Sequence, residues 1–541
     1  MSAKPWLEYY DPGVPKTLQP YPHITLLDHV RDTAQQRPRH TALIFKGERI
    51  SYGELEWRSD ALARALIANG LKKGDRVALI MPNTPQYVIA EFGVWKAGGI
   101  VAAINPLYTG PELVHALTEC DAQIAIVLTL FYDKVKTVQA KTPLKRIIAT
   151  NIREYLPKVL MVAFVLLKEK KEGHRASLRD GDLWLTDLIR ENKGKGRAAV
   201  DVQPEDPALI LLTGGTTGTS KAALATHAAL VQAGLQIRAW FATRMQEWDD
   251  RFMTNLPLFH VFAAVGVQTV ALLGRSAMVM IPNPRDLDDV VANIEKTKPT
   301  FLPGVPTLFN ALLNHPKVKS KAVDMTSIKL CISGAAPLML DTKQRFEALT
   351  GGRIVEGYAL TESMMATVIT PVEGRYKPGF VGLPVTDVEV RIVDADAGAP
   401  DMPCGEIGEV AVRAPQLMSG YWQRPQETAG MLRDGWLYTG DLGYLDEDGY
   451  LSIVDRKKDV IKPSGFQVWP REVEEVIATH PAVQEVGVAG VPDAHAGEAV
   501  KAYVVLREGM TATEAEIREY CRRSLTGYKV PKYVDFRTAR P

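Results

Sequence analysis

The sequence predicts an α/β protein with a large N-terminal domain of stacked α/β sheets, a small β-barrel-like subdomain, and a small mobile α+β C-terminal domain. Three observations support this fold class. Residues 40–130 alternate apolar strand-like runs with helical periodicity, which is typical of a parallel sheet. Strands of period two with turn-rich flanks appear from residue 388, and charged and glycine-containing segments follow from residue 455.

The first half of the chain is predicted to contain buried strands and a helix between the first two of them. Each strand is a short apolar run bounded by turn residues, and the helix has apolar residues at helical spacing. The predicted strands are 77–81, 99–104, 124–128, 208–212 and 277–281, and the predicted helix is 87–95. Later, residues 388–393 and 408–412 alternate apolar and polar side chains, which favours a small antiparallel sheet or barrel. More than one sheet is therefore expected.

The last part of the chain is predicted to be a separate domain. A charged cluster runs from Asp455 to Asp459, and the elements expected after it are a helix at 470–480 and strands at 483–488 and 499–505. Taken alone, the charged cluster favours a solvated turn. A charged connection between domains is also where rigid-body motion is expected. The expected domains are residues 1–454 and 455–541.

The composition excludes several classes of protein. Of the 541 residues, 46% are hydrophobic and 23% are charged, as in an ordinary globular protein. The balance of 64 basic and 63 acidic residues argues against a nucleic-acid partner bound by bulk charge. We expect no signal peptide and no membrane-spanning segment. The cysteines lack metal-ligand spacing and indicate a reducing compartment, by default the cytoplasm; they are Cys120, Cys331, Cys404 and Cys521.

One short apolar segment bears on membrane contact. Residues 159–167 form a nine-residue apolar run between Lys158 and a charged stretch that begins at Lys168. The run is too short to cross a bilayer. Two interpretations stay open: a helix that lies on a membrane surface as a peripheral contact, or a buried helix with a charged exit.

Residues 213–221 have the composition of a phosphate-binding loop. They contain three glycines and five hydroxyl side chains, end at Lys221, and directly follow an apolar run. Glycines let backbone N–H groups approach an anion, hydroxyls add donors, and the lysine supplies a charge. Gly218 and Lys221 are not adjacent, as a Walker loop requires, and the glycines lack the spacing of a dinucleotide fingerprint. We expect a loop of a third kind that holds a nucleotide polyphosphate; the alternative is a flexible surface linker.

Two further segments carry groups that suit the rest of a nucleotide. Gly357, Tyr358, Thr361 and Glu362 combine an aromatic face for a base, a hydroxyl group and a carboxylate that can hold Mg²⁺. Asp441 follows a tight turn, and its carboxylate suits the two hydroxyls of a ribose. Each cluster alone is a weak indication, because a single loop carboxylate usually lies on the surface. Their joint order along the chain is a strong one.

With these motifs in this order, the sequence resembles the adenylate-forming superfamily of acyl-CoA synthetases, firefly-type luciferases and peptide-synthetase adenylation domains. It is most similar to the long-chain fatty-acid–CoA ligases, from about residue 25 onward. The resemblance implies an acid–thiol ligase that uses ATP and Mg²⁺ to convert a fatty acid to an acyl-adenylate and transfers the acyl group to CoA. A carboxylate needs this activation because its charge repels a thiolate and its oxygen is a poor leaving group.

The resemblance also implies roles for individual residues. The catalytic residues would be Lys221, Thr361, Glu362, Lys462 and His260, with Glu362 as the magnesium ligand. The nucleotide would be held by Thr213, Gly214, Gly215, Thr216, Thr217, Gly218, Thr219, Gly334, Ala335, Ala336, Gly357, Tyr358, Asp441 and Arg456. An aliphatic tail would suit a pocket lined by Trp240, Phe241, Phe262 and Val265.

Four residues have expected roles that depend on domain motion or on burial. Asp455 would be the hinge, and Gly465 would lie with Lys462 in a loop that rotates into the site for thioester formation. His260 would form a wall of the acyl pocket, although its apolar neighbours equally fit a histidine satisfied in the core. A general base is not required, because the attacking carboxylate is already ionised.

The sequence departs from the family pattern at two points. Ala222 stands where the family usually has a glycine after the loop lysine, which stiffens the exit turn and is expected to be tolerated. The Gly-Lys pair that should follow Phe536 is absent from the sequence as given. Removing one preorganised charged donor commonly slows a reaction on the order of 10²–10³-fold. We therefore expect slow adenylation and retained thioester formation from a supplied acyl-adenylate.

Other functions stay open alongside the ligase. One is a fatty-acyl-AMP ligase or adenylation domain that serves a carrier protein. Another is an adenylation-impaired nucleotide-binding protein, which would follow from the missing lysine. A luciferase-like monooxygenase is the remotest of them.

Overall fold

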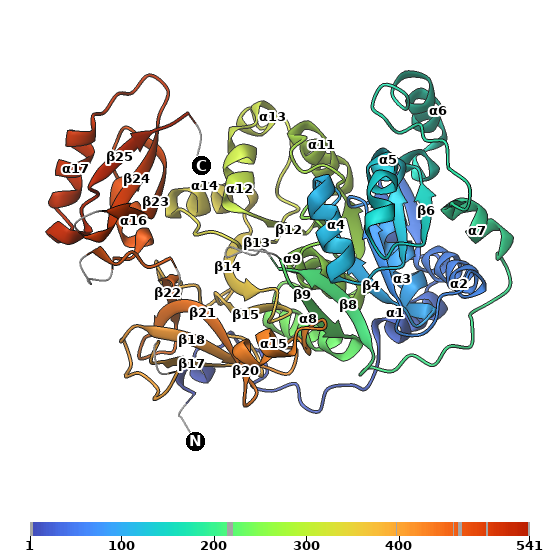
Figure 1. Ribbon diagram of the computed structural model, residues 1–541, viewed down its shortest axis with the longest axis horizontal. Helices are drawn as coiled ribbons and strands as arrows, with labels where there is room; N and C mark the ends of the chain where they lie inside the picture. The colour runs from blue at the N-terminus through green and yellow to red at the C-terminus, as the bar shows by residue number, and fades with distance from the viewer. Residues whose placement is uncertain are drawn as a thin grey trace.

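The computed structural model describes residues 4–213, 220–395, 398–457, 459–463, 468–493 and 496–538. Figure 1 shows a large body built from the N-terminal part of the chain and a small C-terminal unit set to one side of it. Four sheets make up the strands of these described residues, so the expectation of more than one sheet is confirmed. The α/β fold class is confirmed as well.

The first large sheet has eight strands in the order β19-β9-β8-β4-β3-β5-β6-β7. The six strands from β8 to β7 are parallel, and β9 and β19 join their edge in antiparallel pairing. The strands are β3 (Arg76–Ile80), β4 (Ile100–Ala103), β5 (Ile124–Leu128), β6 (Arg146–Thr150), β7 (Leu183–Trp184), β8 (Pro207–Leu212), β9 (Ala222–Thr226) and β19 (Gly420–Tyr421).

The second large sheet has nine strands in the order β16-β15-β14-β13-β12-β10-β11-β1-β2. Its central strands are parallel, and antiparallel strands close both edges. The strands are β1 (Thr41–Phe45), β2 (Glu48–Ser51), β10 (Arg251–Thr254), β11 (Ala277–Met280), β12 (Phe301–Gly304), β13 (Leu330–Ser333), β14 (Arg353–Leu360), β15 (Met365–Ile369) and β16 (Leu383–Pro384).

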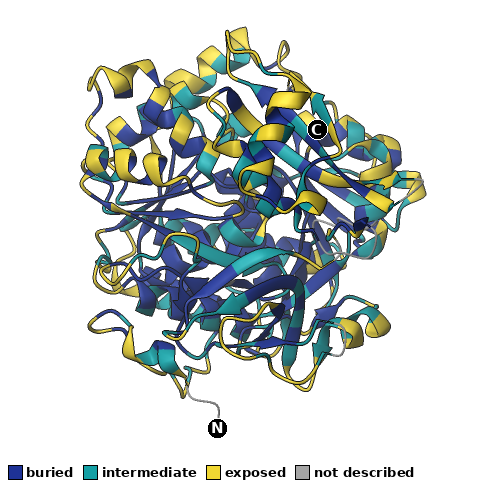
Figure 2. Ribbon diagram, turned by 90° about the vertical axis from the view of Figure 1, so that its left-hand side faces the viewer, coloured by how far each residue is buried: buried dark blue, intermediate teal, exposed yellow. Residues whose placement is uncertain are grey.

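Helices cover these sheets, and most expose one face to solvent (Figure 2). They are α1 (Leu26–Gln36), α2 (Tyr52–Ala68), α4 (Gly110–Glu119), α5 (Thr129–Val138), α7 (Leu185–Glu191), α8 (His227–Trp240), α11 (Leu287–Thr297), α12 (Pro306–Asn314), α13 (Pro316–Lys319) and α14 (Leu340–Thr350). In α3 (Pro85–Lys96), by contrast, every residue is buried. It is the helix predicted at 87–95, and it packs against α2, β3 and β4.

Two smaller sheets complete the fold. The barrel-like unit expected from residue 388 is an antiparallel five-stranded sheet formed by β17 (Glu389–Val393), β18 (Gly408–Arg413), β20 (Leu432–Arg433), β21 (Trp436–Leu445) and β22 (Leu451–Arg456). The C-terminal unit has its own apolar core. It contains β23 (Val483–Asp493), β24 (Gly497–Leu506), β25 (Tyr533–Phe536), α16 (Pro470–Ala478) and α17 (Glu514–Arg522).

The apolar segment 159–167 is not part of the core. It forms α6 (Lys158–Leu167), which contains no buried residue. The interpretation as a buried helix is therefore wrong, because the run contributes its apolar side chains to the surface. None of the described helices is long and apolar enough to span a membrane.

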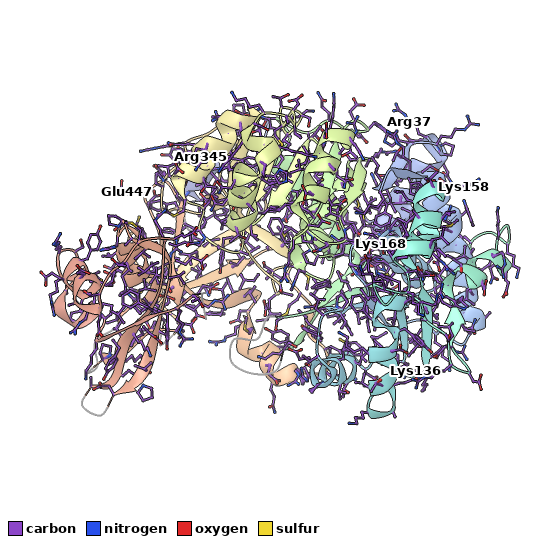
Figure 3. The ribbon with its side chains drawn as sticks, turned by 90° about the horizontal axis from the view of Figure 1, so that it is seen from above. Arg37, Lys136, Lys158, Lys168, Arg345 and Glu447 are labelled. Carbon is purple, nitrogen blue, oxygen red and sulfur yellow. The ribbon has the colours of Figure 1, made fainter. Side chains whose placement is uncertain are left out.

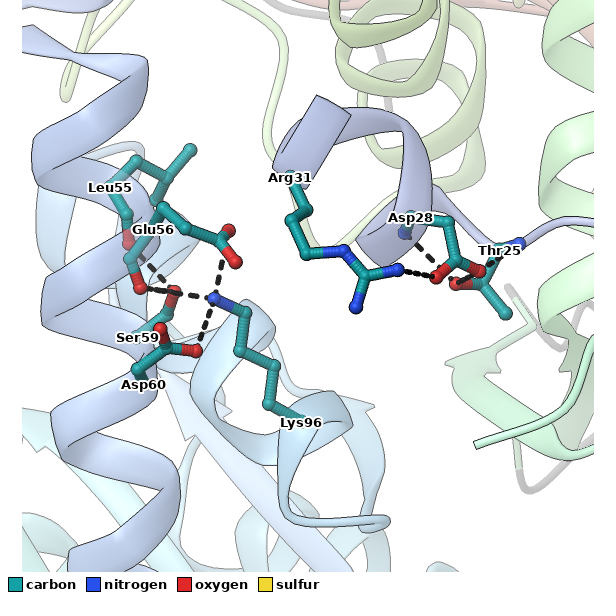
Figure 4. A network of polar contacts seen from close by, with 8 residues as sticks. All are labelled: Thr25, Asp28, Arg31, Leu55, Glu56, Ser59, Asp60 and Lys96. Carbon is teal, nitrogen blue, oxygen red and sulfur yellow. Dashed lines mark hydrogen bonds and ion pairs between the residues drawn. The ribbon is translucent and has the colours of Figure 1, made fainter. Parts of the chain in front are cut away.

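A buried ion cluster holds α3 against α2. The Nζ atom of Lys96 lies 2.9 Å from Glu56 Oε2 and 2.8 Å from Asp60 Oδ1, and it also donates to the backbone oxygen of Glu56 (Figure 4). The Lys96 side chain is fully buried. A capping box at the start of α1, formed by Thr25 and Asp28, lies nearby in the same view. Because a lone buried charge is costly, Lys96 and its two carboxylates stabilise the fold only as a set.

Replacing Lys96 should therefore destabilise the protein strongly. Lys96→Met leaves Glu56 and Asp60 without their cation, and breaking a buried pair in this way costs about 3–5 kcal/mol of unfolding free energy. Urea denaturation followed by circular dichroism measures the loss. The matched control is Arg345→Ala, which breaks an exposed pair with Asp341 at 3.2 Å and should change stability little. Equal effects of the two variants would contradict this account of α3.

Candidate active site

The predicted phosphate-binding loop connects two antiparallel strands. Leu212, the last residue of β8, pairs with Ala222, the first residue of β9. The two ends of the loop are joined by hydrogen bonds, since Thr213 N–H donates to Lys221 O at 2.9 Å and Lys221 N–H donates to Thr213 Oγ1 at 3.2 Å. Ala222 lies in a strand rather than in an exit turn, which explains why no glycine is needed there. The loop residues Gly214, Gly215, Thr216, Thr217, Gly218 and Thr219 lie outside the described residues.

Lys221 and Glu362 both contact Tyr421, a residue that the sequence analysis missed. The Lys221 Nζ atom lies 4.9 Å from the centre of the Tyr421 ring, and the Tyr421 hydroxyl donates to Glu362 Oε1 at 2.7 Å. Burial, together with the neighbouring carboxylate, raises the pKa of the Tyr421 hydroxyl, so it stays a donor. Tyr421 reaches this position because β19 pairs with β9. The glycine that precedes this tyrosine is a weak signal, because Gly-Tyr pairs are common in ordinary surface turns.

A second cluster brings together Tyr358, Asp441 and Arg456. The Tyr358 hydroxyl donates to Asp441 Oδ2 at 2.6 Å, and Arg456 Nε lies 3.4 Å from Asp441 Oδ1. Asp441 and Arg456 are direct partners in the pairing of β21 with β22. Burial and the Asp441 charge raise the pKa of Tyr358. Three residues that the sequence analysis assigned to one ligand therefore lie in contact.

An apolar cavity of about 340 Å³ lies against β14, the strand that carries Tyr358. Predicted residues line it from three segments: His260 from one, Gly334 and Ala335 from the loop after β13, and Gly357 and Thr361 from β14 and the residue after it. The loop after β13 is held close to its neighbours, because a Cβ at Gly334 would lie 3.0 Å from the Phe262 ring. Ala336 is exposed and is not among the lining residues.

His260 stands at the wall of this cavity and is exposed, so it is not a histidine satisfied in the core. The apolar surroundings remove water from part of the ring and lower its pKa below the ordinary value. The imidazole is accordingly neutral at pH 7. A neutral ring offers one donor and one acceptor at the cavity wall.

The expected acyl pocket is only partly matched by the lining of this cavity. Of the four residues expected to surround an aliphatic tail, Phe241 and Phe262 line the cavity, whereas Trp240 and Val265 are not among its lining residues. Gly266 also lines it, and a Cβ at this position would lie 2.6 Å from the Met365 methyl group. Gly266 belongs to the π-helix η4 (Ala264–Thr269), which places backbone where a side chain would fill the space.

Asp455 links the five-stranded sheet to the C-terminal unit. Its Oδ2 atom accepts from Arg471 N–H at 3.0 Å, in the first turn of α16, and Arg471 Nη1 donates to Ile453 O at 2.8 Å. Burial raises the pKa of Asp455. Lys462 is exposed, and its backbone N–H donates to Glu498 Oε2 at 2.7 Å, so the small sheet sets its position. Gly465 lies outside the described residues.

The carboxylates of the site suit a metal ion that takes most of its ligands from phosphate oxygens and water. Among the described residues, no group of three or more histidine, cysteine, aspartate or glutamate side chains could hold a metal ion. Glu362 instead offers a single carboxylate beside Lys221 and Tyr421. One carboxylate plus phosphate oxygens and water is the usual environment of Mg²⁺. The donor set therefore fits Mg²⁺ carried by a polyphosphate.

Comparison with known proteins gives a match over nearly the whole chain. The model for the AMP-binding enzyme family matches residues 30–422, and the model for the AMP-binding enzyme C-terminal domain matches residues 472–541. A long-chain-fatty-acid–CoA ligase of Bacillus subtilis (strain 168) is 38% identical, over 100% of this chain and 96% of its own length. The protein of the same name from Yersinia pestis is 40% identical, over 99% of this chain and 95% of its own.

Solved structures resemble the fold at similar coverage. ATP-bound MatB from Rhodopseudomonas palustris superposes with a TM-score of 0.82 and 31% identity, covering 96% of each chain. A fatty acyl CoA synthetase of Mycobacterium tuberculosis gives a TM-score of 0.73 and 27% identity, covering 96% of this chain and 95% of its own.

The π-helix that shapes the cavity is braced by a buried acid. Gln268 Nε2 donates to Glu91 Oε2, and burial raises the pKa of Glu91 to about 8. The remaining oxygens, Glu91 Oε1 and Gln268 Oε1, have no hydrogen-bond partner among the described residues. When Glu91 is ionised, both of these oxygens can only accept hydrogen bonds. The contact is therefore more favourable when Glu91 is protonated.

This pair predicts a pH-dependent stability. Between the unfolded pKa of 4.5 and about 8, the unfolded chain releases a proton that folded Glu91 keeps, so stability falls as pH rises. Glu91→Gln removes the titration, and its Tm relative to the wild type should increase from pH 5 to pH 8. The exposed Glu447→Gln is the control and should show no such trend. A pH-independent difference for Glu91→Gln would mean that Glu91 is ionised in the fold.

Proposed function

Because the chain belongs to the family of AMP-binding enzymes, we propose that it is a long-chain-fatty-acid–CoA ligase. In the first step, a carboxylate oxygen of the fatty acid attacks the α-phosphorus of ATP. A new O–P bond forms, the bond to the bridging oxygen breaks, and pyrophosphate leaves. In the second step, the CoA thiolate attacks the acyl carbon and AMP leaves. The full-length similarity to ligases of this name carries the proposal.

In the first step, the hairpin loop and Lys221 bind the β- and γ-phosphates. The reaction brings an anionic carboxylate against a charged phosphate, so cations and backbone donors must offset the repulsion. Lys221 contacts the ring of Tyr421 and Glu362 accepts from its hydroxyl, so Tyr421 holds both charged side chains near each other. Mg²⁺ held by Glu362 and the phosphates would supply further positive charge. Thr361, next to Glu362, contacts phosphate.

The nucleoside lies at the second cluster. Tyr358 offers its ring to the adenine, and the loop of Gly334, Ala335 and Ala336 borders the base. Asp441 accepts from the ribose hydroxyls with Arg456 beside it. The hydrogen bond from Tyr358 to Asp441 supports this assignment, because it fixes the ring and the carboxylate relative to each other.

The apolar cavity binds the acyl chain, and His260 forms part of its wall. The lowered pKa of His260 supports this role, since a neutral ring does not trap the fatty acid carboxylate as an ion pair. The carboxylate is ionised at neutral pH and needs no general base.

The thioester step uses a rotation of the C-terminal domain, residues 455–541, about Asp455. Lys462 and Gly465 would then enter the site with CoA, while residues 1–454 keep the acyl-adenylate. Support comes from the few hydrogen bonds that join Asp455 and Ile453 to Arg471. The proposal includes peripheral contact with a membrane, because long-chain fatty acids partition into lipid.

The function is tested by an acid panel. We expect release of AMP that depends on both CoA and acid, with kcat/KM highest for long-chain fatty acids such as palmitate and oleate, and low for acetate and benzoate. Chromatography of AMP and acyl-CoA measures both products. Release only with aromatic acids, or AMP formation without acyl-CoA, would contradict the proposal.

The same panel run on a cavity variant tests the acyl site. Gly266→Val places a side chain against Met365 and should lower the preference for long over short acids roughly tenfold, as removal of space for one or more methylenes does. Activity with short acids reports that the variant is folded. Gly527→Val is the control, because a Cβ there would meet nothing within 4 Å.

Tyr421 should matter for the first step. Tyr421→Phe removes a hydrogen bond to a carboxylate, and such bonds contribute about 1.5–3 kcal/mol, so pyrophosphate release should slow by roughly tenfold or more. Thioester formation from a supplied acyl-adenylate should change less. Tyr450→Phe is the control, because its hydroxyl donates to the backbone oxygen of Arg375 at 2.8 Å, outside the site. An unchanged first step in Tyr421→Phe would remove this residue from the proposed machinery.

A further inference from the structure

The outer face of α6 consists of apolar side chains. Val159 is 81% exposed, Leu166 is 76% exposed and Leu167 is 72% exposed. Leu160, Val162 and Ala163 share this face, because residues three and four apart on a helix lie together. Surface helices normally turn a polar face to solvent. We infer that α6 is a docking element that inserts its apolar face into the surface of an anionic lipid bilayer. The helix α6 would make the membrane contact that the proposed function includes, and the physiological role of this contact rests on that proposed function.

The inner side of α6 is anchored to the large body, so the apolar face does not turn inward. The Phe164 ring packs edge-on against His174, with ring centres 5.3 Å apart. The buried Glu169 just after the helix accepts from Arg153 Nη1 at 2.7 Å and from Asn151 Nδ2 at 3.1 Å. These contacts fix the helix by its inner side and by the residues that follow it.

The charges around α6 complement an anionic surface. Lys158 and Lys168 flank the helix (Figure 3), and Lys170 and Lys171 follow. Residues 158–179 contain six basic and two acidic side chains, a net charge of 6 − 2 = +4. One of the two acids is the buried Glu169, and the other, Glu172, lies 3.5 Å from Lys168. An apolar face rimmed by lysines is the usual pattern of a helix that lies in a membrane interface.

The same charges argue against a second copy of the chain as the occupant. Two copies of α6 packed face to face in antiparallel fashion would bring Lys158 of each copy toward the lysines that follow the helix of the other. A ten-residue helix is also only about 15 Å long, which provides less buried area than a stable interface needs.

The helix α6 and the β8–β9 hairpin of the proposed active site lie toward opposite edges of the eight-stranded sheet. The helix belongs to the connection between β6 and β7, at one edge of the eight-stranded sheet, and it projects from the body at the end remote from the C-terminal unit (Figure 1). The hairpin of β8 and β9 lies near the other edge. Four strand spacings separate β6 from β8, about 19 Å. Docking at α6 would therefore take place about four strands away from β8, which leads into the hairpin of the proposed function.

Sedimentation with lipid vesicles tests the inference on the full chain. The vesicles contain phosphatidylcholine alone or mixed with phosphatidylglycerol. We expect the variant Val159→Ser/Leu166→Ser/Leu167→Ser to bind mixed vesicles at least about tenfold more weakly than the wild type. Lys170→Gln/Lys171→Gln should weaken binding to mixed vesicles only, and salt should abolish that difference. Leu107→Ser is the control, because Leu107 is 66% exposed elsewhere on the surface.

Each outcome has a definite meaning. Vesicle binding by the triple variant equal to that of the wild type overturns the inference. A change in its sedimentation velocity without vesicles, at unchanged vesicle binding, overturns it in favour of a second copy. Unchanged Tm and unchanged activity with octanoate, a soluble acid, confirm that the variants are folded. If no protein forms octanoyl-CoA while vesicle binding follows the expected pattern, the proposed function fails and the docking inference stands.

Discussion

Pairing of the two-residue strand β19 with β9 is the constraint on which the site depends. It brings Tyr421 beside Lys221, two hundred residues earlier in the chain, and through Tyr421 it joins Lys221 to Glu362. The residue before Tyr421 in this strand leaves no room for a side chain. Gly420 has a φ of +143°, and a Cβ there would lie 2.8 Å from the Thr428 methyl group. Arg424 then binds both carboxylate oxygens of Glu119, which fixes the following segment to α4. The two-residue strand β19 can hold this position because it pairs with β9 and because the segment after it is bound to α4 through Arg424 and Glu119.

Much of the fold could be predicted from the sequence, because the signals are local. Apolar runs of five or six residues between turn residues predict β3, β4, β5, β8 and β11, and alternation predicts β17 and β18. The site motifs were equally local, and Tyr358, Asp441 and Arg456 do lie in contact. The strand predicted at 483–488 continues to Asp493 as β23, since pairing with β24 extends it beyond its apolar part.

The features that sequence reasoning missed are products of long-range pairing. The residues around Tyr421 show neither helical nor strand periodicity. Its place in the site depends on the pairing of β19 with β9 and on its hydrogen bond to Glu362. The N-terminal segment gave no signal either, yet Asp11 accepts from the backbone N–H groups of Val372 and Glu373 and so braces the chain after β15. The helix at 87–95 was predicted, but periodicity could not tell that Glu91 and Lys96 are buried in it, one next to an amide and the other between two carboxylates.

The hydrogen bonds around the Asp455 carboxylate bear on what drives the proposed rotation of the C-terminal domain. The carboxylate accepts from the positive N-terminal end of α16, and Arg471 of the same helix donates to Ile453. Each of these bonds has a charged partner, and such hydrogen bonds contribute about 1.5–3 kcal/mol each. A ligand that binds with micromolar affinity contributes about 8 kcal/mol, which is more than these two bonds together, so the ligand bound at the site, rather than the hinge, would decide which orientation the enzyme adopts.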